Sequence, residues 1–196
     1  MKMVYVPEGS FEMGSATGDD DEKPVRQVYL DAYWIDKYEV TNGQYKQCVD
    51  AGMCTKPKGI HSNHRSSYYG TNTYANYPVI NVNWYQAQTY CQWAGGDLPT
   101  EAQWEKAARG TDARNYPWGN KIPNSAMANF GNYKGDTVEV GTYPYRASPY
   151  GALDMAGNVR EWVRDWFEDY DANETNNPTG PSSGAFRVVR GGAWTS

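Results

Sequence analysis

The stretch Gly151-Ala-Leu-Asp-Met-Ala-Gly-Asn-Val-Arg-Glu-Trp162 places two carboxylates, Asp154 and Glu161, seven residues apart around a Gly-Asn turn. Calcium takes about six to eight oxygen ligands, many of them main-chain carbonyls, and tolerates irregular geometry. The carbonyls of Gly157 and Val159 can point inward between the two carboxylates. This spacing allows a calcium site, but such stretches are common in turns, so the pattern alone favours a turn that holds no metal.

A second stretch upstream has the same character. In Ala128-Asn-Phe-Gly-Asn-Tyr-Lys-Gly-Asp136, an amide at Asn129 and a carboxylate at Asp136 bracket a turn-rich segment. Zinc is the weaker alternative, because His61 and His64 are the only histidines and no cysteine is placed to join them. The acidic run at residues 19–22 is interpreted as a solvated loop rather than a metal site.

Regular periodicity nearly vanishes after Gly110, where we expect only short strands at residues 138–143, 161–166 and 187–190. A pattern this sparse is typical of disorder, but eight Trp and seventeen Tyr in the chain argue for a packed interior. Something other than strand ladders must order these loops, and bound metal ions are the natural candidate.

The first half of the chain shows clearer elements. Residues 3–14 alternate apolar and polar side chains around a Pro-Glu-Gly turn and predict a hairpin, and residues 25–35 predict a further strand. A short helix is expected over residues 39–49 with Thr41 as its N-cap, and a second over 86–94 that ends at two glycines. Residues 56–77 are polar and rich in Gly, Ser, Asn and Tyr, which predicts a long surface loop.

The most regular pattern lies at residues 98–109. Thr100 suits an N-cap, and Gln103 three residues later completes a capping box. A helix from this point buries one stripe of side chains, namely Ala102, Trp104, Ala107 and Ala108.

Bulk properties limit the possible partners. The length of 196 residues suits one domain, and the net charge of −5 without a cluster of Lys and Arg argues against nucleic acid. No segment approaches the roughly 20 apolar residues that span a bilayer. The first residues lack the apolar run of a signal peptide, so any export signal is expected upstream.

The chain has three cysteines, an odd number, so at least one cannot be in a disulfide within the chain. Cys48 and Cys54 can close a small loop through a disulfide if the protein is exported, which leaves Cys91 without a partner. The alternative is that all three are small buried apolar residues.

Eight segments, in order along the chain, resemble the formylglycine-generating enzyme (sulfatase-modifying factor) family. They are Val6-Pro-Glu-Gly-Ser-Phe-Glu-Met-Gly14, Glu39-Val-Thr-Asn42, Pro78-Val-Ile-Asn-Val-Asn-Trp84, Tyr90-Cys-Gln-Trp-Ala94, Leu98-Pro-Thr-Glu-Ala-Gln-Trp-Glu105, Tyr116-Pro-Trp-Gly-Asn120, Gly151-Ala-Leu-Asp-Met-Ala-Gly-Asn-Val-Arg-Glu-Trp162 and Arg187-Val-Val-Arg-Gly-Gly-Ala-Trp194.

The resemblance implies a C-type-lectin-like α+β fold. This fold is loop-rich, with two or three short helices and small antiparallel sheets, in a single domain over residues 1–196 that is incomplete at its C-terminus. Two calcium ions are implied. The first maps onto Asn129, the Phe130 carbonyl, Asp136 and the Val138 carbonyl. The second maps onto Asp154, the carbonyls of Gly157 and Val159, and Glu161.

The enzymes of this family oxidise a substrate cysteine to formylglycine with a copper ion held by two cysteines. Those cysteines follow the motif that here is Arg190-Gly-Gly-Ala-Trp194, and the sequence ends at Ser196, so we expect no copper site in it. In the family, the final cysteine of the missing segment often pairs with the equivalent of Cys91. A hercynine-oxygenase-like activity fits less well, because it uses several histidines in an added helical domain.

Two hypotheses follow from the resemblance. The first is a calcium-stabilised module without catalysis, extracellular or in the cell envelope, that binds a protein or glycan ligand or associates with itself. Variable proteins that bind diverse ligands are a special case. The second is a copper-dependent, sulfatase-activating oxidase whose two catalytic cysteines lie beyond Ser196.

Overall fold

The computed structural model describes residues 2–196, and three α-helices within them begin at polar capping residues. These are α1 (Asn42–Asp50), α2 (Trp84–Trp93) and α3 (Glu101–Arg109). Thr41 and Thr100 each accept a hydrogen bond from the main-chain N–H three residues later, within a full capping box. Both predicted caps are therefore confirmed, and Asn83 caps α2 in the same way.

The described residues form three small antiparallel sheets of two strands each. The strands are β1 (Met3–Val6), β2 (Gly9–Met13), β3 (Arg26–Leu30), β4 (Tyr33–Asp36), β5 (Glu161–Trp166) and β6 (Arg187–Arg190). They pair as β1 with β4, β2 with β3, and β5 with β6. The predicted strands at 161–166 and 187–190 are confirmed residue for residue.

The hairpin predicted over residues 3–14 is wrong. β1 and β2 join different sheets, with Val4 opposite Ile35 and Phe11 opposite Val28. The reason lies between the two strands, where the Lys106 ammonium of α3 donates hydrogen bonds to the main-chain oxygens of Pro7 and Gly9 at 2.8 and 2.7 Å. These oxygens face the helix, so they do not accept the hydrogen bonds of a hairpin between β1 and β2.

Two further expectations are corrected by the main-chain hydrogen bonds. Residues 25–35 form two strands, because the chain bends at Asp31, whose N–H donates to Asn177 Oδ1 at 2.9 Å. Residues 138–143 form turns rather than a strand. There, Val138 N–H donates to Asn158 Oδ1 and Gly141 N–H to Asp154 Oδ2, so side chains from another loop replace a neighbouring strand.

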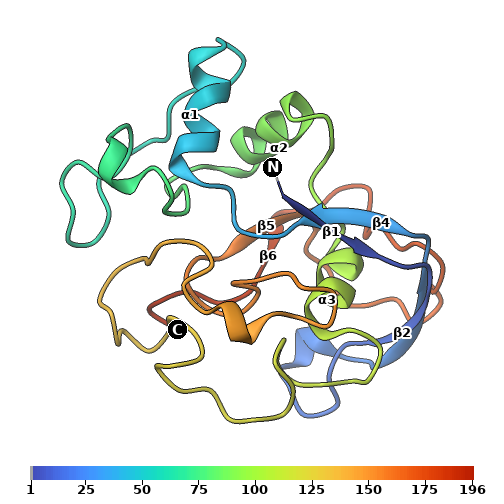
Figure 1. Cartoon of the computed structure of the whole chain (residues 1–196). Coiled ribbons are helices and arrows are strands. Elements are labelled where there is room, and N and C mark those ends of the chain that lie inside the picture. The colour runs from blue at the N-terminus through green and yellow to red at the C-terminus, as the bar shows by residue number, and fades with distance from the viewer. Residues whose placement is uncertain (1) are drawn as a thin grey trace.

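Helix α3 lies at the centre of the molecule, against β2 and β5, whereas α1 and α2 lie together on the far side of the β1–β4 pair (Figure 1). Its predicted buried stripe is confirmed, with Ala102, Trp104, Ala107 and Ala108 all at most 5% exposed. The helix also buries Glu105 and Lys106, which the apolar pattern did not indicate. Glu105 accepts from Gly14 N–H and pairs with Arg109 and Arg190.

A cluster of buried aromatic rings packs around the disulfide that joins Cys48 and Cys54. The predicted bond is therefore confirmed, and Cys91 keeps its thiol. Tyr45 stacks on Tyr90, with ring centroids 5.6 Å apart. Residues 56–77 form a loop as predicted, but it buries Tyr68 and Tyr69 and contains the short 3₁₀ helix η2 (Asn72–Tyr74).

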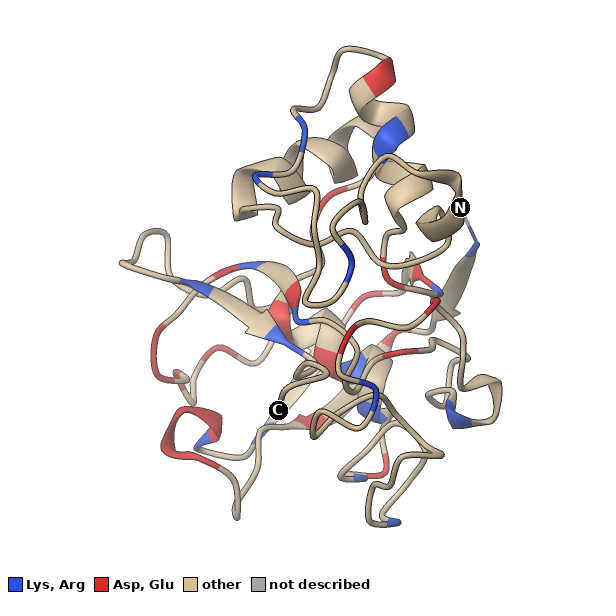
Figure 2. Ribbon diagram, turned by 90° about the vertical axis from the view of Figure 1, so that its left-hand side faces the viewer, with Lys and Arg blue, Asp and Glu red and all other residues tan. Residues whose placement is uncertain are grey.

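Acidic and basic positions are scattered along a ribbon that is mostly neither (Figure 2). The acidic run at residues 19–22 forms a turn that includes η1 (Asp20–Glu22), and Asp19, Asp20 and Asp21 are exposed, as the solvated-loop interpretation expects. A last 3₁₀ helix is η3 (Pro144–Arg146). No helix among residues 2–196 has the length and hydropathy to cross a bilayer.

Candidate calcium-binding region

The two predicted ligand sets lie side by side and are joined by Asn158. Its Oδ1 accepts from Asn129 Nδ2 at 3.2 Å and from Val138 N–H at 2.9 Å, while its Nδ2 donates to Glu39 Oε2 at 2.6 Å. Asn158 has a φ of +62°, which asparagine tolerates better than most residues, and its side chain is 2% exposed. Sequence reasoning missed this link, although the Gly-Asn turn was its signal.

Gly157 allows the two sets to meet. It has a φ of +84°, and a Cβ at this position would lie 2.5 Å from the main-chain oxygen of Asn129. The next residue secures the contact, because Asn158 N–H donates to that same Asn129 oxygen at 2.8 Å. Only glycine permits so close an approach of the two loops.

The second set places Asp154 and Glu161 in partly buried positions. Asp154 Oδ2 accepts from Gly141 N–H at 2.6 Å, and Glu161 Oε2 accepts from Trp104 Nε1 at 3.0 Å. Burial raises the pKa of Asp154 to about 6, against the effect of that hydrogen bond. Burial also raises the pKa of Glu161 to about 7, with a further contribution from the charge of Asp154.

Glu39 is a third carboxylate in this region, and sequence reasoning did not assign it a role. It is 5% exposed, and its Oε1 accepts from Val159 N–H at 3.0 Å. Burial raises its pKa well above the ordinary value, and the charges of Asp154 and Glu161 raise it further. Its signal was its place in the Glu-Val-Thr-Asn segment that resembles the family.

This group of carboxylates forms no ion pair within the part of the chain that the structure describes. Within residues 2–196, no Lys or Arg nitrogen lies within 4 Å of a carboxylate oxygen of Glu39, Asp154 or Glu161. Neighbouring carboxylates without a counterion either bind protons or lie beside a bound cation. Among residues 2–196 no three acidic, Cys or His side chains converge closely enough to hold a metal by themselves, so an ion at Asp154 and Glu161 would need main-chain oxygens as well. Calcium accepts carboxylate and carbonyl oxygens, so the residue types of the second set fit it.

The first set is arranged differently. Asn129 is 1% exposed and turns its amide nitrogen, not its oxygen, to the main-chain oxygen of Asp136 at 2.9 Å. The Phe130 carbonyl accepts from Tyr133 N–H, and the Val138 carbonyl from Asn158 Nδ2. The structure thus brings the four predicted residues together. Apart from the Asn129 amide oxygen, their predicted ligand oxygens already accept hydrogen bonds from the protein's own donors.

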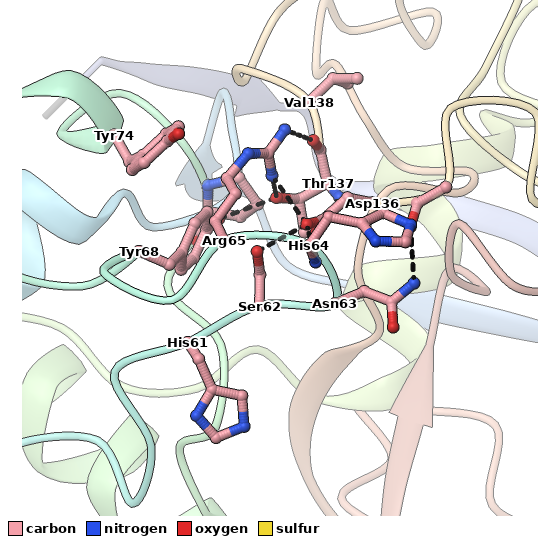
Figure 3. A network of polar contacts seen from close by, with 12 residues as sticks. His61, Ser62, Asn63, His64, Arg65, Tyr68, Tyr74, Asp136, Thr137 and Val138 are labelled. Atoms are coloured by element: carbon pink, nitrogen blue, oxygen red, sulfur yellow. Dashed lines mark hydrogen bonds and ion pairs between the residues drawn. The ribbon is translucent and has the colours of Figure 1, made fainter.

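The Asp136 carboxylate faces the loop at residues 56–77 (Figure 3). Its Oδ2 accepts from Ser62 Oγ at 2.6 Å and from His64 N–H at 2.9 Å, and lies 3.2 Å from Arg65 Nη1. Its Oδ1 accepts from Thr137 N–H at 2.7 Å. Burial raises the pKa of Asp136, but these hydrogen bonds outweigh it and hold the pKa below its ordinary value.

The oxygen of the Asn129 amide has no hydrogen-bond partner within residues 2–196, and neither has the buried hydroxyl of Tyr143. Both side chains line a cavity of about 10 Å³, together with Asp154 and Asn158. This is the space of about one water molecule. A single small occupant there would give both buried oxygens a partner on the Asp154 side of the region.

A larger cavity of about 140 Å³ lies between α2 and β5, and Asp36, Glu39, Cys91 and Glu161 are among the residues that line it. Burial, with the nearby charge of Asp36, raises the pKa of the Cys91 thiol to about 12. The thiolate is the reactive form of cysteine, so this residue is poorly suited to act as a nucleophile at neutral pH.

Three small antiparallel sheets, a central helix and loops joined by a Gly-Asn turn agree with the expected formylglycine-generating-enzyme-like domain. The chain belongs to the family described as "Sulfatase-modifying factor enzyme 1-like domain", whose model matches residues 1–196. The expected α+β fold is confirmed by solved structures. PvdO from Pseudomonas aeruginosa superimposes with a TM-score of 0.79 at 26% identity, over 98% of this chain and 82% of that one.

Further relatives come from proteins of different kinds. Treponema denticola variable protein 1 superimposes with a TM-score of 0.78 at 27% identity, over 99% of this chain and 84% of that one. The serine/threonine-protein kinase pkn1 of Chlamydia caviae is 39% identical over 211 residues, which are 100% of this chain and 33% of the kinase. The formylglycine-generating enzyme of Mus musculus is 33% identical over 245 residues, or 98% of this chain and 66% of that enzyme. The chain thus spans about a third of the kinase's length.

Proposed function

We propose that this domain is a calcium-stabilised module that has a binding or structural role and no catalysis of its own. The observation that carries the proposal is the group of three neighbouring carboxylates, Glu39, Asp154 and Glu161, none of which has a Lys or Arg nitrogen within 4 Å among residues 2–196. Asp154, Glu161 and the carbonyls of Gly157 and Val159 would hold the ion. Bound calcium would neutralise the carboxylates and fix loops that have few strand contacts.

The chemistry of the cysteines supports a role without catalysis. Cys48 and Cys54 are joined to each other, and the Cys91 thiol is held protonated by its surroundings. The domain also matches a part of relatives whose names differ, including protein kinases and a variable protein. A stable scaffold attached to different partners accounts for such a distribution.

We place the protein outside the cell or in the cell envelope, because the Cys48–Cys54 disulfide suits an oxidising compartment. Its partner in this proposal is a protein or glycan ligand, or a second copy of the chain. The short two-stranded sheets have edges to which another strand can add.

The alternative function is that of a copper-dependent oxidase that converts cysteine to formylglycine. The identity with the mouse formylglycine-generating enzyme favours it. It requires a pair of copper-binding cysteines, and in residues 1–196 only Cys91 remains outside the disulfide. Copper titration of the full natural chain, followed by a thiol assay, distinguishes the two: a tight complex with two cysteine ligands supports the oxidase.

Calorimetric unfolding tests the calcium proposal. We expect EDTA to lower the melting temperature by several degrees and calcium, but not magnesium, to restore it. Asp154→Ala and Glu161→Ala, which remove the side-chain oxygens, should abolish the response to calcium. Asp112→Ala, which removes an exposed carboxylate paired with Arg114, is the matched control and should respond like the natural protein. If the natural protein melts at the same temperature in EDTA and in calcium, the proposal fails.

A further inference from the structure

The loop at residues 56–77 delivers a positive charge to the first ligand set. Arg65 Nη1 lies 3.2 Å from Asp136 Oδ2 and donates to Thr137 Oγ1 at 3.1 Å, while Nη2 donates to the Thr137 carbonyl at 3.0 Å. Figure 3 shows the guanidinium beside these two residues, with Tyr68 and Tyr74 on its other side. The guanidinium thus binds the Asp136 carboxylate, which belongs to the first set, and the Thr137 carbonyl, which adjoins it. Carboxylate and carbonyl oxygens are the kinds of atom that a calcium ion would take.

Aromatic rings hold the guanidinium in place. Its central carbon lies 5.0 Å from the ring centre of Tyr77 and 5.1 Å from that of Tyr74, within the range of cation–π attraction. The Tyr68 hydroxyl also contacts Thr137 Oγ1, at 3.0 Å. The Arg65 side chain is 21% exposed and the Asp136 side chain 3%, so the pair is largely shielded from solvent.

The remaining atoms of the first set leave little room for a metal ion. Oδ2 of Asp136 already receives Ser62 Oγ, His64 N–H and Arg65, and Oδ1 receives Thr137 N–H. Asn129 donates from its amide nitrogen to the Asp136 main-chain oxygen. Its amide oxygen has no partner within residues 2–196, and the residue lines the small cavity beside Asp154. A calcium ion at Asp136 would have to displace these donors and would meet the repulsion of the guanidinium.

We infer that Arg65 takes the place of a calcium ion at the first ligand set, so that this chain binds one calcium ion, at the second set, rather than two. Calcium binding at the second set rests on the proposed function. The contact between Arg65 and Asp136 does not, because it involves only the chain's own atoms. The loop at residues 56–77 is accordingly held in place whether or not calcium is present.

A double-mutant cycle with Arg65→Met, Asp136→Asn and both changes together tests the pair. Urea unfolding is measured in EDTA and in saturating calcium, and bound calcium is counted by calorimetric titration. We expect a coupling of about tenfold in the unfolding equilibrium, equal in the two conditions. Each variant should still bind one calcium ion per chain, while Asp154→Ala, which removes the side-chain oxygens, should bind none.

Two results would overturn the inference. One is a natural chain that binds two calcium ions, one of which is lost in Asp136→Asn. The other is a coupling that is absent in EDTA. A chain that binds no calcium but keeps the coupling refutes the proposed function and leaves the role of Arg65 standing. If Asp136→Asn does not fold, Arg65→Met and Arg65→Lys carry the test, since both leave Ser62, His64 and Thr137 in place as donors to Asp136.

Discussion

Gly157→Ala tests whether the two acidic loops depend on their close contact. The added Cβ would lie 2.5 Å from the Asn129 oxygen and 3.1 Å from its carbonyl carbon, both of them main-chain atoms that cannot rotate away. Alanine at a φ of +84° costs about 1–2 kcal/mol by itself. Separating the loops also weakens the 2.8 Å bond from Asn158 N–H and the 2.6 Å bond from Gly157 N–H to the Gly191 oxygen. Each lost bond costs about 1 kcal/mol, so we expect a total loss of about 3–4 kcal/mol.

Urea unfolding followed by tryptophan fluorescence measures this loss, and Gly70→Ala is its matched control. Gly70 has a φ of +86°, and no atom lies within 4 Å of the Cβ that alanine would add. This variant therefore has the unfavourable backbone conformation without a steric clash. We expect Gly70→Ala to lose about 1–2 kcal/mol. Equal losses in the two variants would refute the reasoning, because they would show that contact between the loops contributes nothing to stability.

Three other predictions concern stability. Burial raises the folded-state pKa of Glu101 to about 7, although the positive charge of Arg190 lowers it. The protonated side chain therefore stabilises the fold fully below about pH 4.5, and this stabilisation is lost as the pH rises through 7. Glu101→Gln should reduce the fall in unfolding free energy over this range by about 3 kcal/mol, and an unchanged pH profile would contradict the cause given. Lys106→Met leaves the carbonyls of Pro7 and Gly9 without their donor and should cost about 2–4 kcal/mol in urea unfolding, whereas the exposed Lys134→Met should change stability by less than about 0.5 kcal/mol. Replacing Cys48 and Cys54 by serine opens a short loop and should cost about 2–3 kcal/mol, measured against Cys91→Ser.

Local chemistry was enough to predict the helices and the covalent link. The caps at Thr41 and Thr100 satisfy N–H groups only three residues away, so their sequence signal is complete within one turn. Cys48 and Cys54 are likewise close along the chain, with their Cα atoms 5.2 Å apart. The β5 and β6 strands were predicted at residues 161–166 and 187–190, although their pairing with each other was not.

The pairing of the first four strands depended on a residue far away in the sequence. Local alternation predicted a hairpin over residues 3–14, because no residue in that segment indicates that the distant Lys106 ammonium donates to its main-chain oxygens. The predicted strand at residues 138–143 failed for the same reason, since Asn158 and Asp154 take its N–H groups.

The candidate site was likewise predicted in part from local sequence and in part only from the tertiary structure. The sequence by itself determined the acidic and amide residues, the Gly-Asn turn and the family pattern, because these depend on residue type and on spacing over a few positions. Only the tertiary structure decided that Glu39 and Asn158 lie beside the second set and that Arg65 pairs with Asp136. Charges that are distant in sequence set one another's surroundings once folding brings them within a few ångströms, and that proximity is a property of the packed chain.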